Sequence, residues 1–144
     1  MNWLRRLAVA VFASVVVLSA GGCADTTSAR DMFGGEPLAT EDYPGLVLVH
    51  DSWWDGEAPG YMGKPSYVKV IRSFGAQSPG GLRRGFDALV AAAEKSGWAP
   101  DDGNSSALFS AHKHSPQGDA HLLIAISKLE RPYLVIMSMQ ARTP

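Results

Sequence analysis

Hydrophobic and polar positions change their spacing several times along the chain, and each change predicts a different element. Apolar residues recur at helical spacing after Ser78, a typical N-cap that is followed by a proline at the first helical position, and before Gly97, which suits a left-handed stop. We therefore predict one long amphipathic helix, with Trp98 folded back towards its last turn. Its apolar stripe comprises Leu82, Phe86, Leu89, Val90 and Ala93.

Apolar runs outside this helix predict five strands. The first, at 46–50, is a short continuous run of the kind that forms a buried strand. The others, at 67–74, 107–112, 121–128 and 133–140, show alternation, and short turns between the last three favour an antiparallel meander. The strand residues expected to meet the helix are Phe109, Leu122, Ile124, Ile126 and Val135.

The order β-loop-β-α-β-β-β predicts a two-layer α+β domain at 43–144, with one main helix on a mostly antiparallel sheet of about five strands. Residues 23–42 precede it and lack a sustained period. Small and polar residues dominate them, which predicts a flexible tether with an average span of about 25 Å. Met32 and Phe33 are the exception, and they either dock on the domain or mark a contact with a partner.

The first 22 residues have the organisation of an export signal. Arg5 and Arg6 precede an uncharged apolar run from Leu7 to Leu18, and small residues lead from there to Cys23. A helix of twelve residues is about 18 Å long, well short of the ~30 Å hydrocarbon core of a bilayer. The pattern therefore predicts a cleaved signal peptide at 1–22 rather than a permanent span.

The tetrapeptide that ends this signal, Ala20-Gly21-Gly22-Cys23, resembles the lipobox of bacterial lipoproteins. The resemblance implies cleavage before Cys23, a diacylglyceryl group on its sulfur and an anchor on the outer face of the cell membrane. Two acyl chains hold a protein stably on a bilayer, whereas one does so only marginally. Ala20 stands where the family commonly has a bulky aliphatic residue, and ordinary cleavage after Ala20 is the competing interpretation. The composition of the rest loosely resembles small actinobacterial lipoproteins.

Charge argues against nucleic acid as a partner. The chain has 13 basic and 14 acidic residues, and loss of Arg5 and Arg6 with the signal leaves eleven against fourteen, a net charge of −3. The same balance argues against electrostatic attraction to anionic lipid headgroups. No phosphate-binding loop or other cofactor motif is present, so we expect no cofactor. Cys23 is the only cysteine, so the domain must be stable without an internal disulfide.

A segment rich in aromatic residues, at 51–65, is the most unusual part of the chain. Three glycines and two prolines exclude regular structure from most of it, and the segment either folds over the core as a plug or offers an aromatic platform beside carboxylates. A platform of this kind suits a sugar ring or a cationic group. Because neighbouring side chains on an extended backbone point to opposite sides, at least one of the two tryptophans is expected at the surface. The platform residues are Trp53, Trp54, Tyr61, Asp55 and Glu57.

Three histidines are the other chemical candidates. His112 and His114 share one side of a predicted strand, and His121 follows the next turn, so a closed hairpin brings them near one another as weak candidates for metal ligands. No nucleophile motif accompanies them. We therefore expect a non-catalytic binding or accessory module whose partner is an envelope protein or a cell-wall glycan. The alternatives are a small extracytoplasmic hydrolase or metal-binding protein, and an accessory subunit without a ligand.

Overall fold

Six antiparallel strands form one sheet in the described part of the chain, which in this computed structural model covers residues 27–56, 67–127 and 133–142. The strand order is β1-β2-β6-β5-β4-β3. The elements are α1 (Ala29–Phe33), α2 (Pro37–Thr40), β1 (Val47–Trp54), β2 (Tyr67–Ala76), α3 (Pro79–Lys95), β3 (Ala99–Pro100), β4 (Leu108–Ser115), β5 (Gly118–Ile126) and β6 (Tyr133–Arg142). The predicted α+β fold is confirmed, with six strands rather than about five because β3 adds two residues at one edge.

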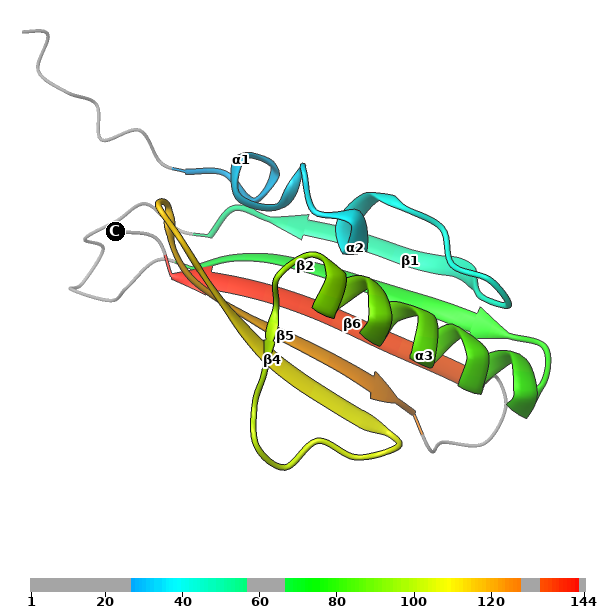
Figure 1. The fold of residues 1–144 in the computed structure, drawn as a ribbon. Coiled ribbons are helices and arrows are strands. Elements are labelled where there is room, and N and C mark those ends of the chain that lie inside the picture. Colours follow the sequence, from blue (N-terminus) through cyan, green and yellow to red (C-terminus); the bar gives the residue numbers. More distant parts are fainter. Residues whose placement is uncertain (1–26, 57–66, 128–132, 143–144) are drawn as a thin grey trace, which may run out of the picture.

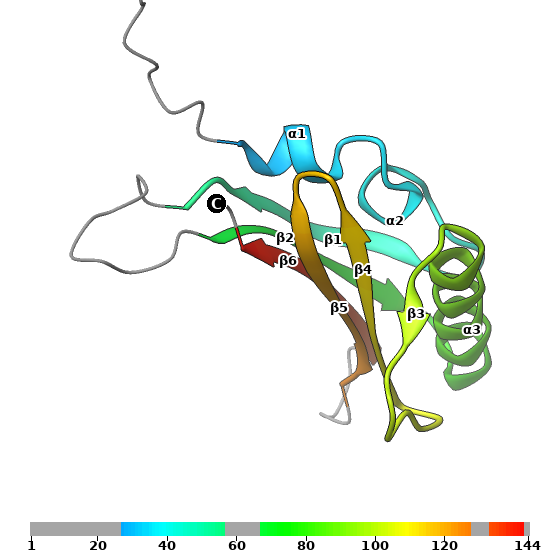
Figure 2. The same cartoon turned by 60° about the vertical axis from the view of Figure 1, so that its left-hand side comes forward.

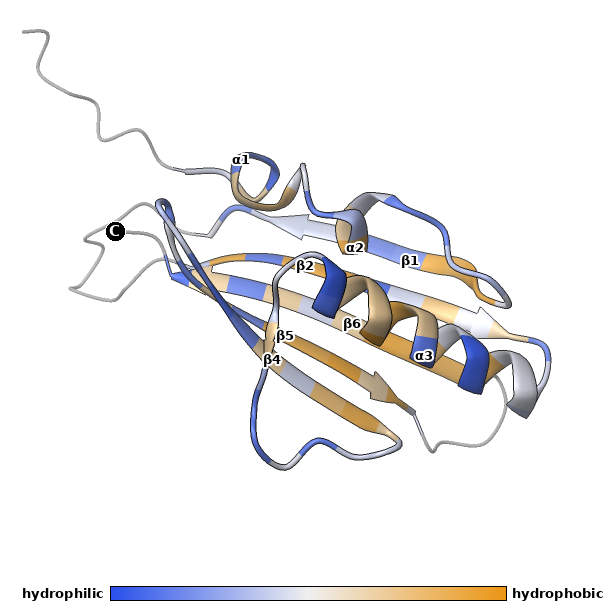
Figure 3. Ribbon diagram, in the orientation of Figure 1, coloured by the Kyte–Doolittle hydropathy of each residue, from blue (hydrophilic) through white to orange (hydrophobic). Residues whose placement is uncertain are grey.

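The helices α1, α2 and α3 lie on the same side of this sheet, as Figures 1 and 2 show. The strands consequently bury alternate residues against the helices, and Figure 3 shows the apolar colouring concentrated on the strands below α3. The buried strand positions are Val68, Val70, Arg72, Phe74, Phe109, Ala111, Ala120, Leu122, Ile124, Val135, Met137, Met139 and Ala141. We call this side the covered face and the opposite side the open face.

The predicted main helix is confirmed as α3. The Ser78 hydroxyl accepts a hydrogen bond from the Gly81 backbone N–H at 3.0 Å, which satisfies one of the donors left free at a helix start. Gly97 has φ 88°, a conformation that favours glycine. The chain then turns back, so that the Trp98 backbone N–H donates to the Ala93 carbonyl oxygen at 3.1 Å. α3 contacts β2, β5 and β6.

The predicted tether is wrong from residue 27 onward, because this stretch carries two short helices that pack on the sheet. In α1, Ser28 and Asp31 form a reciprocal capping box, and Pro37 occupies the first turn of α2. Four apolar side chains of these helices are buried in the core, namely Ala29, Phe33, Leu38 and Ala39. The folded domain therefore includes the residues from Ser28 to Asp42, which the prediction had left outside it. Cys23 lies outside the described residues.

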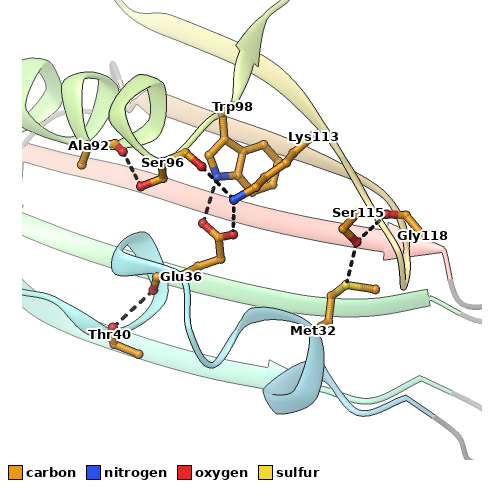
Figure 4. Close-up of polar contacts among 9 residues, drawn as sticks. All are labelled: Met32, Glu36, Thr40, Ala92, Ser96, Trp98, Lys113, Ser115 and Gly118. Atoms are coloured by element: carbon orange, nitrogen blue, oxygen red, sulfur yellow. Dashed lines mark hydrogen bonds and ion pairs between the residues drawn. The ribbon is translucent and has the colours of Figure 1, made fainter.

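Polar contacts attach this N-terminal segment, residues 27–42, to the far strands (Figure 4). The Glu36 carboxylate accepts hydrogen bonds from the Trp98 indole N–H at 3.2 Å and from the Lys113 ammonium. Lys113 also donates to the Ser96 backbone carbonyl oxygen at 2.8 Å. Because Glu36 and Lys113 are both largely buried, their charges are screened less than those of a surface pair.

A buried arginine holds the other end of the segment. Arg72, on β2, donates from Nη1 to the backbone carbonyl oxygens of Leu38 at 3.0 Å and Glu41 at 2.8 Å. Leu38 is in the single turn of α2 and Glu41 is its C-cap, positions whose carbonyls lack a partner within the helix. Near α1, the Ser115 hydroxyl contacts the Met32 sulfur at 4.0 Å. Of the two outcomes expected for Met32 and Phe33, docking on the domain is confirmed.

The first strand differs from its prediction in position and burial. β1 runs from Val47 to Trp54 and is an edge strand, so Val47 and Val49 are about three-fifths exposed rather than buried. Its extension also shows that regular structure continues to Trp54, within the predicted loop. Leu46, just before β1, is buried against α3, where a Cβ on Gly85 would lie 2.2 Å from the Leu46 Cγ.

Candidate binding surface on the open face

The two adjacent tryptophans point to opposite faces, as the alternation predicts. Trp53 is half-buried on the covered face, and the Arg30 guanidinium carbon lies 4.6 Å from its ring centroid. Trp54 is 52% exposed on the open face. Trp53 thus fastens α1 to the sheet, whereas Trp54 is available for a contact.

The carboxylate expected beside the platform has a structural role instead. Asp55, directly after β1, accepts a hydrogen bond from the Ala29 backbone N–H at 2.7 Å. An anionic oxygen at this position satisfies a free donor and complements the positive end of the short helix α1. Of the predicted platform residues, Tyr61 and Glu57 lie outside the described residues. The five residues are therefore not shown to form one site.

The open face joins Trp54 to the candidate histidines. Strand register places five residues in one line across β1, β2, β6, β5 and β4. Since neighbouring strands lie about 4.8 Å apart, the line is roughly 19 Å long. We call this line the polar row, and it consists of Trp54, Lys69, Gln140, His121 and His112.

Hydrogen bonds fix two of the histidines near this row. His112 Nδ1 lies 2.6 Å from the Asp101 Oδ1, and His114 Nδ1 lies 2.6 Å from the Asp119 Oδ1. The pKa of Asp101 is lowered, chiefly by the hydrogen bond that the Ser110 hydroxyl donates and then by the bond with His112. The pKa of Asp119 is lowered chiefly by its bond with His114.

The predicted approach of the histidines is only partly realised. His112 and His121 are direct partners on neighbouring strands, and the rings of His112 and His114 have centroids 5.6 Å apart. However, no three His, Cys, Asp or Glu side chains within 27–56, 67–127 and 133–142 are arranged to hold a metal ion. The open face presents these imidazole groups as hydrogen-bonding side chains.

Apolar side chains cover the other half of the open face. Leu108, Ala125 and Ile136 are register partners across β4, β5 and β6. Leu123 lies on β5 between Ala125 and His121 of the polar row. Leu123 is 45% exposed, and Leu108 and Ile136 are 39% exposed. Together with Ile71 of β2, these residues form what we call the apolar half.

Sequence reasoning did not find Lys69, Gln140 or the apolar half as parts of a site. Each of these residues alternates with core residues on its own strand, and this alternation could have placed it on the face opposite the core. Their adjacency depends on β6 lying between β2 and β5, and this order is not visible from the sequence of elements.

No protein-family model, curated protein or solved structure matches this chain. No helix in the described ranges has the length and hydrophobicity needed to cross a bilayer.

Proposed function

We propose that this protein is an extracytoplasmic lipoprotein, held on the cell membrane by a diacylglyceryl group on Cys23, and that its domain is a non-catalytic binding module. The anchor is supported by the Arg5–Cys23 signal pattern. The binding role is supported by one observation above all, the open face of the sheet.

The open face exposes large apolar side chains to water, which is unfavourable in free energy unless a partner covers them. Leu108, Leu123 and Ile136 are large apolar side chains gathered on three adjacent strands, although alternate positions of the same strands are fully packed beneath α3. Contiguous exposed apolar surface rimmed by polar residues is typical of a protein interaction site. The apolar half next to the polar row has this composition, which favours an envelope protein as the partner.

The anchor has a direct test. Native protein should sediment with membranes and carry the mass of the acyl chains, whereas Cys23→Ser protein should lose both. Thr27→Ala is the matched control, because it changes a hydroxyl close to the cysteine and leaves both the sulfur and the Ser28 cap of α1 intact. Firm membrane association of the Cys23→Ser protein, or a native protein without acyl mass, would contradict the proposed anchor.

The contact surface is tested by photo-cross-linking in intact cells. A photoreactive residue at Ile136 should give a discrete adduct, and one at Arg84, which is exposed on the outer side of α3, should not. Leu123→Asp should remove the Ile136 adduct, because it places a charge in the middle of the apolar half without touching the core. Equal adducts from Ile136 and Arg84, or an adduct that survives Leu123→Asp, would exclude the open face as the contact.

A further inference from the structure

The N-terminal segment enters the domain at one end of the sheet. The Ala29 backbone N–H is bonded to Asp55, at the end of β1, and Met32 contacts Ser115, at the end of β4. Figures 1 and 2 place the start of α1 at the same end as the start of β2, the end of β6 and the β4–β5 turn. We call this the entry end of the domain.

Very little chain separates the entry end from Cys23. Four residues, 24–27, stand between Cys23 and Ser28, the N-cap of α1. Even fully extended, this chain spans about 18 Å, because each residue contributes at most about 3.6 Å. The ten residues of β2 alone are about 33 Å long. An anchored domain therefore cannot swing its opposite end to the bilayer in place of the entry end.

From this length we infer that the entry end rests on the phospholipid headgroups, with Trp54 as its interfacial contact. The inference rests on the proposed acylation of Cys23. The bilayer surface is then the partner of the open face at the entry end, around Trp54. The apolar half stays free for a protein beside the membrane.

The side chains at the entry end suit a headgroup layer. Trp54 and Lys69 are register partners there, and so are Tyr67 and Arg142. Tryptophan and tyrosine are enriched where bilayers meet water, since their rings are apolar with one polar group. Lys69 and Arg142 make no ion pair with a described residue, and both can approach lipid phosphates.

The acidic residues of the same end are hydrogen-bonded within the domain and keep their charge. Asp31 is bonded to Ser28, Asp55 to the α1 backbone and Asp119 to His114, so each carboxylate already has a hydrogen-bonded partner within the domain. The net charge of −3 gives no attraction to anionic lipid. The acyl chains bring the domain to the bilayer, and the aromatic side chains determine which surface meets it.

Tryptophan fluorescence of the acylated, full mature protein in phosphatidylcholine vesicles tests this orientation. Lipids brominated near the headgroup should quench native protein. Quenching should be lost in Trp54→Phe and kept in the matched control Trp53→Phe, because Trp53 lies under Arg30 on the covered face. Trp98 is buried and supplies unquenched emission in every variant.

A length variant completes the test. Insertion between Thr26 and Thr27 of ten Gly and Ser residues, which by themselves have an average span of about 17 Å, should reduce the quenching about two-fold or more. Acylated native protein that is not quenched, or quenching that Trp54→Phe leaves unchanged, would overturn the inference while the proposed anchor stands. Native protein without acyl mass would overturn both.

Discussion

The covered and open faces of the sheet are built by the same five long strands, yet they differ in what their residues do. On the covered face, Val70, Ile124 and Met137 are fully buried beneath helices. On the open face, their neighbours Ile71, Leu123 and Ile136 remain in partial contact with water. The difference comes from where the chain places its helices, since α1, α2 and α3 all pack on one side.

This contrast separates residues that hold the fold from residues that are available for binding. Trp53 and Trp54 show it most directly, because they are adjacent in the chain and fall on different faces. The N-terminal segment belongs entirely to the covered face, where it completes the core beside α3. Substitutions on the two faces should therefore have very different effects on stability.

The largest effect is expected for Phe33→Ala. Phe33 is 2% exposed, and truncating a buried phenylalanine typically lowers the free energy of unfolding by about 3–5 kcal/mol. Urea denaturation of the mature domain measures this loss. Leu123→Ala on the open face is the control and should cost less than about 1 kcal/mol. If both variants lost the same stability, the distinction between the faces would be wrong.

The adjacent tryptophans give the second and closest test. Trp53→Ala removes a half-buried ring that packs against the core and Arg30, so we expect a loss of about 2 kcal/mol, less than for a fully buried residue. Trp54→Ala should change stability by less than about 1 kcal/mol, because its ring is half in water. Thermal unfolding of both variants measures the difference. A larger loss for Trp54→Ala would reverse the assignment of the two side chains.

Sequence patterns were sufficient for the main features of the covered face. The spacing of α3, its Ser78 cap and the alternation of the last three strands depend on local rules, and each is found in the structure. The N-terminal segment was missed because α1 and α2 have five and four residues, too few for a helical period. The Ser28–Asp31 capping box was the one local signal that marked α1.

The polar row could not be predicted because it depends on contacts between distant parts of the chain. Trp54 and His112 lie on the same line only because β6 pairs with both β2 and β5. The sequence suggested two separate candidates, an aromatic platform and a histidine cluster. The register brings one member of the first, Trp54, onto the same face as His112 and His121 of the second.

The ion pair between Glu36 and Lys113 links the N-terminal segment to β4 on the covered face. Glu36→Gln should lower the free energy of unfolding by about 1–2 kcal/mol, because Lys113 loses its anionic partner in a largely buried place and keeps only uncharged ones such as the Ser96 carbonyl and the Trp98 ring. Denaturant titration measures the loss. In a double-mutant cycle, Glu36→Gln should cost much less in a Lys113→Met background. Additive costs would mean that the two side chains do not act together.

The smallest effect is expected for Asp101, whose contact with His112 on the open face should make the stability of the domain depend weakly on pH. The pKa of Asp101 is lowered from 3.8, so its contacts with Ser110 and His112 stabilise the folded state above that pH, and the contribution is lost as the pH falls through the lowered value. The stability lost by Asp101→Asn should therefore be present at neutral pH and vanish in acid. Thermal midpoints measured against pH check this, with exposed Asp102→Asn as the control for removing one charge. A loss that persists in acid would mean that Asp101 stabilises the domain by packing rather than by its charge, and the His112 end of the polar row would then serve the fold rather than binding.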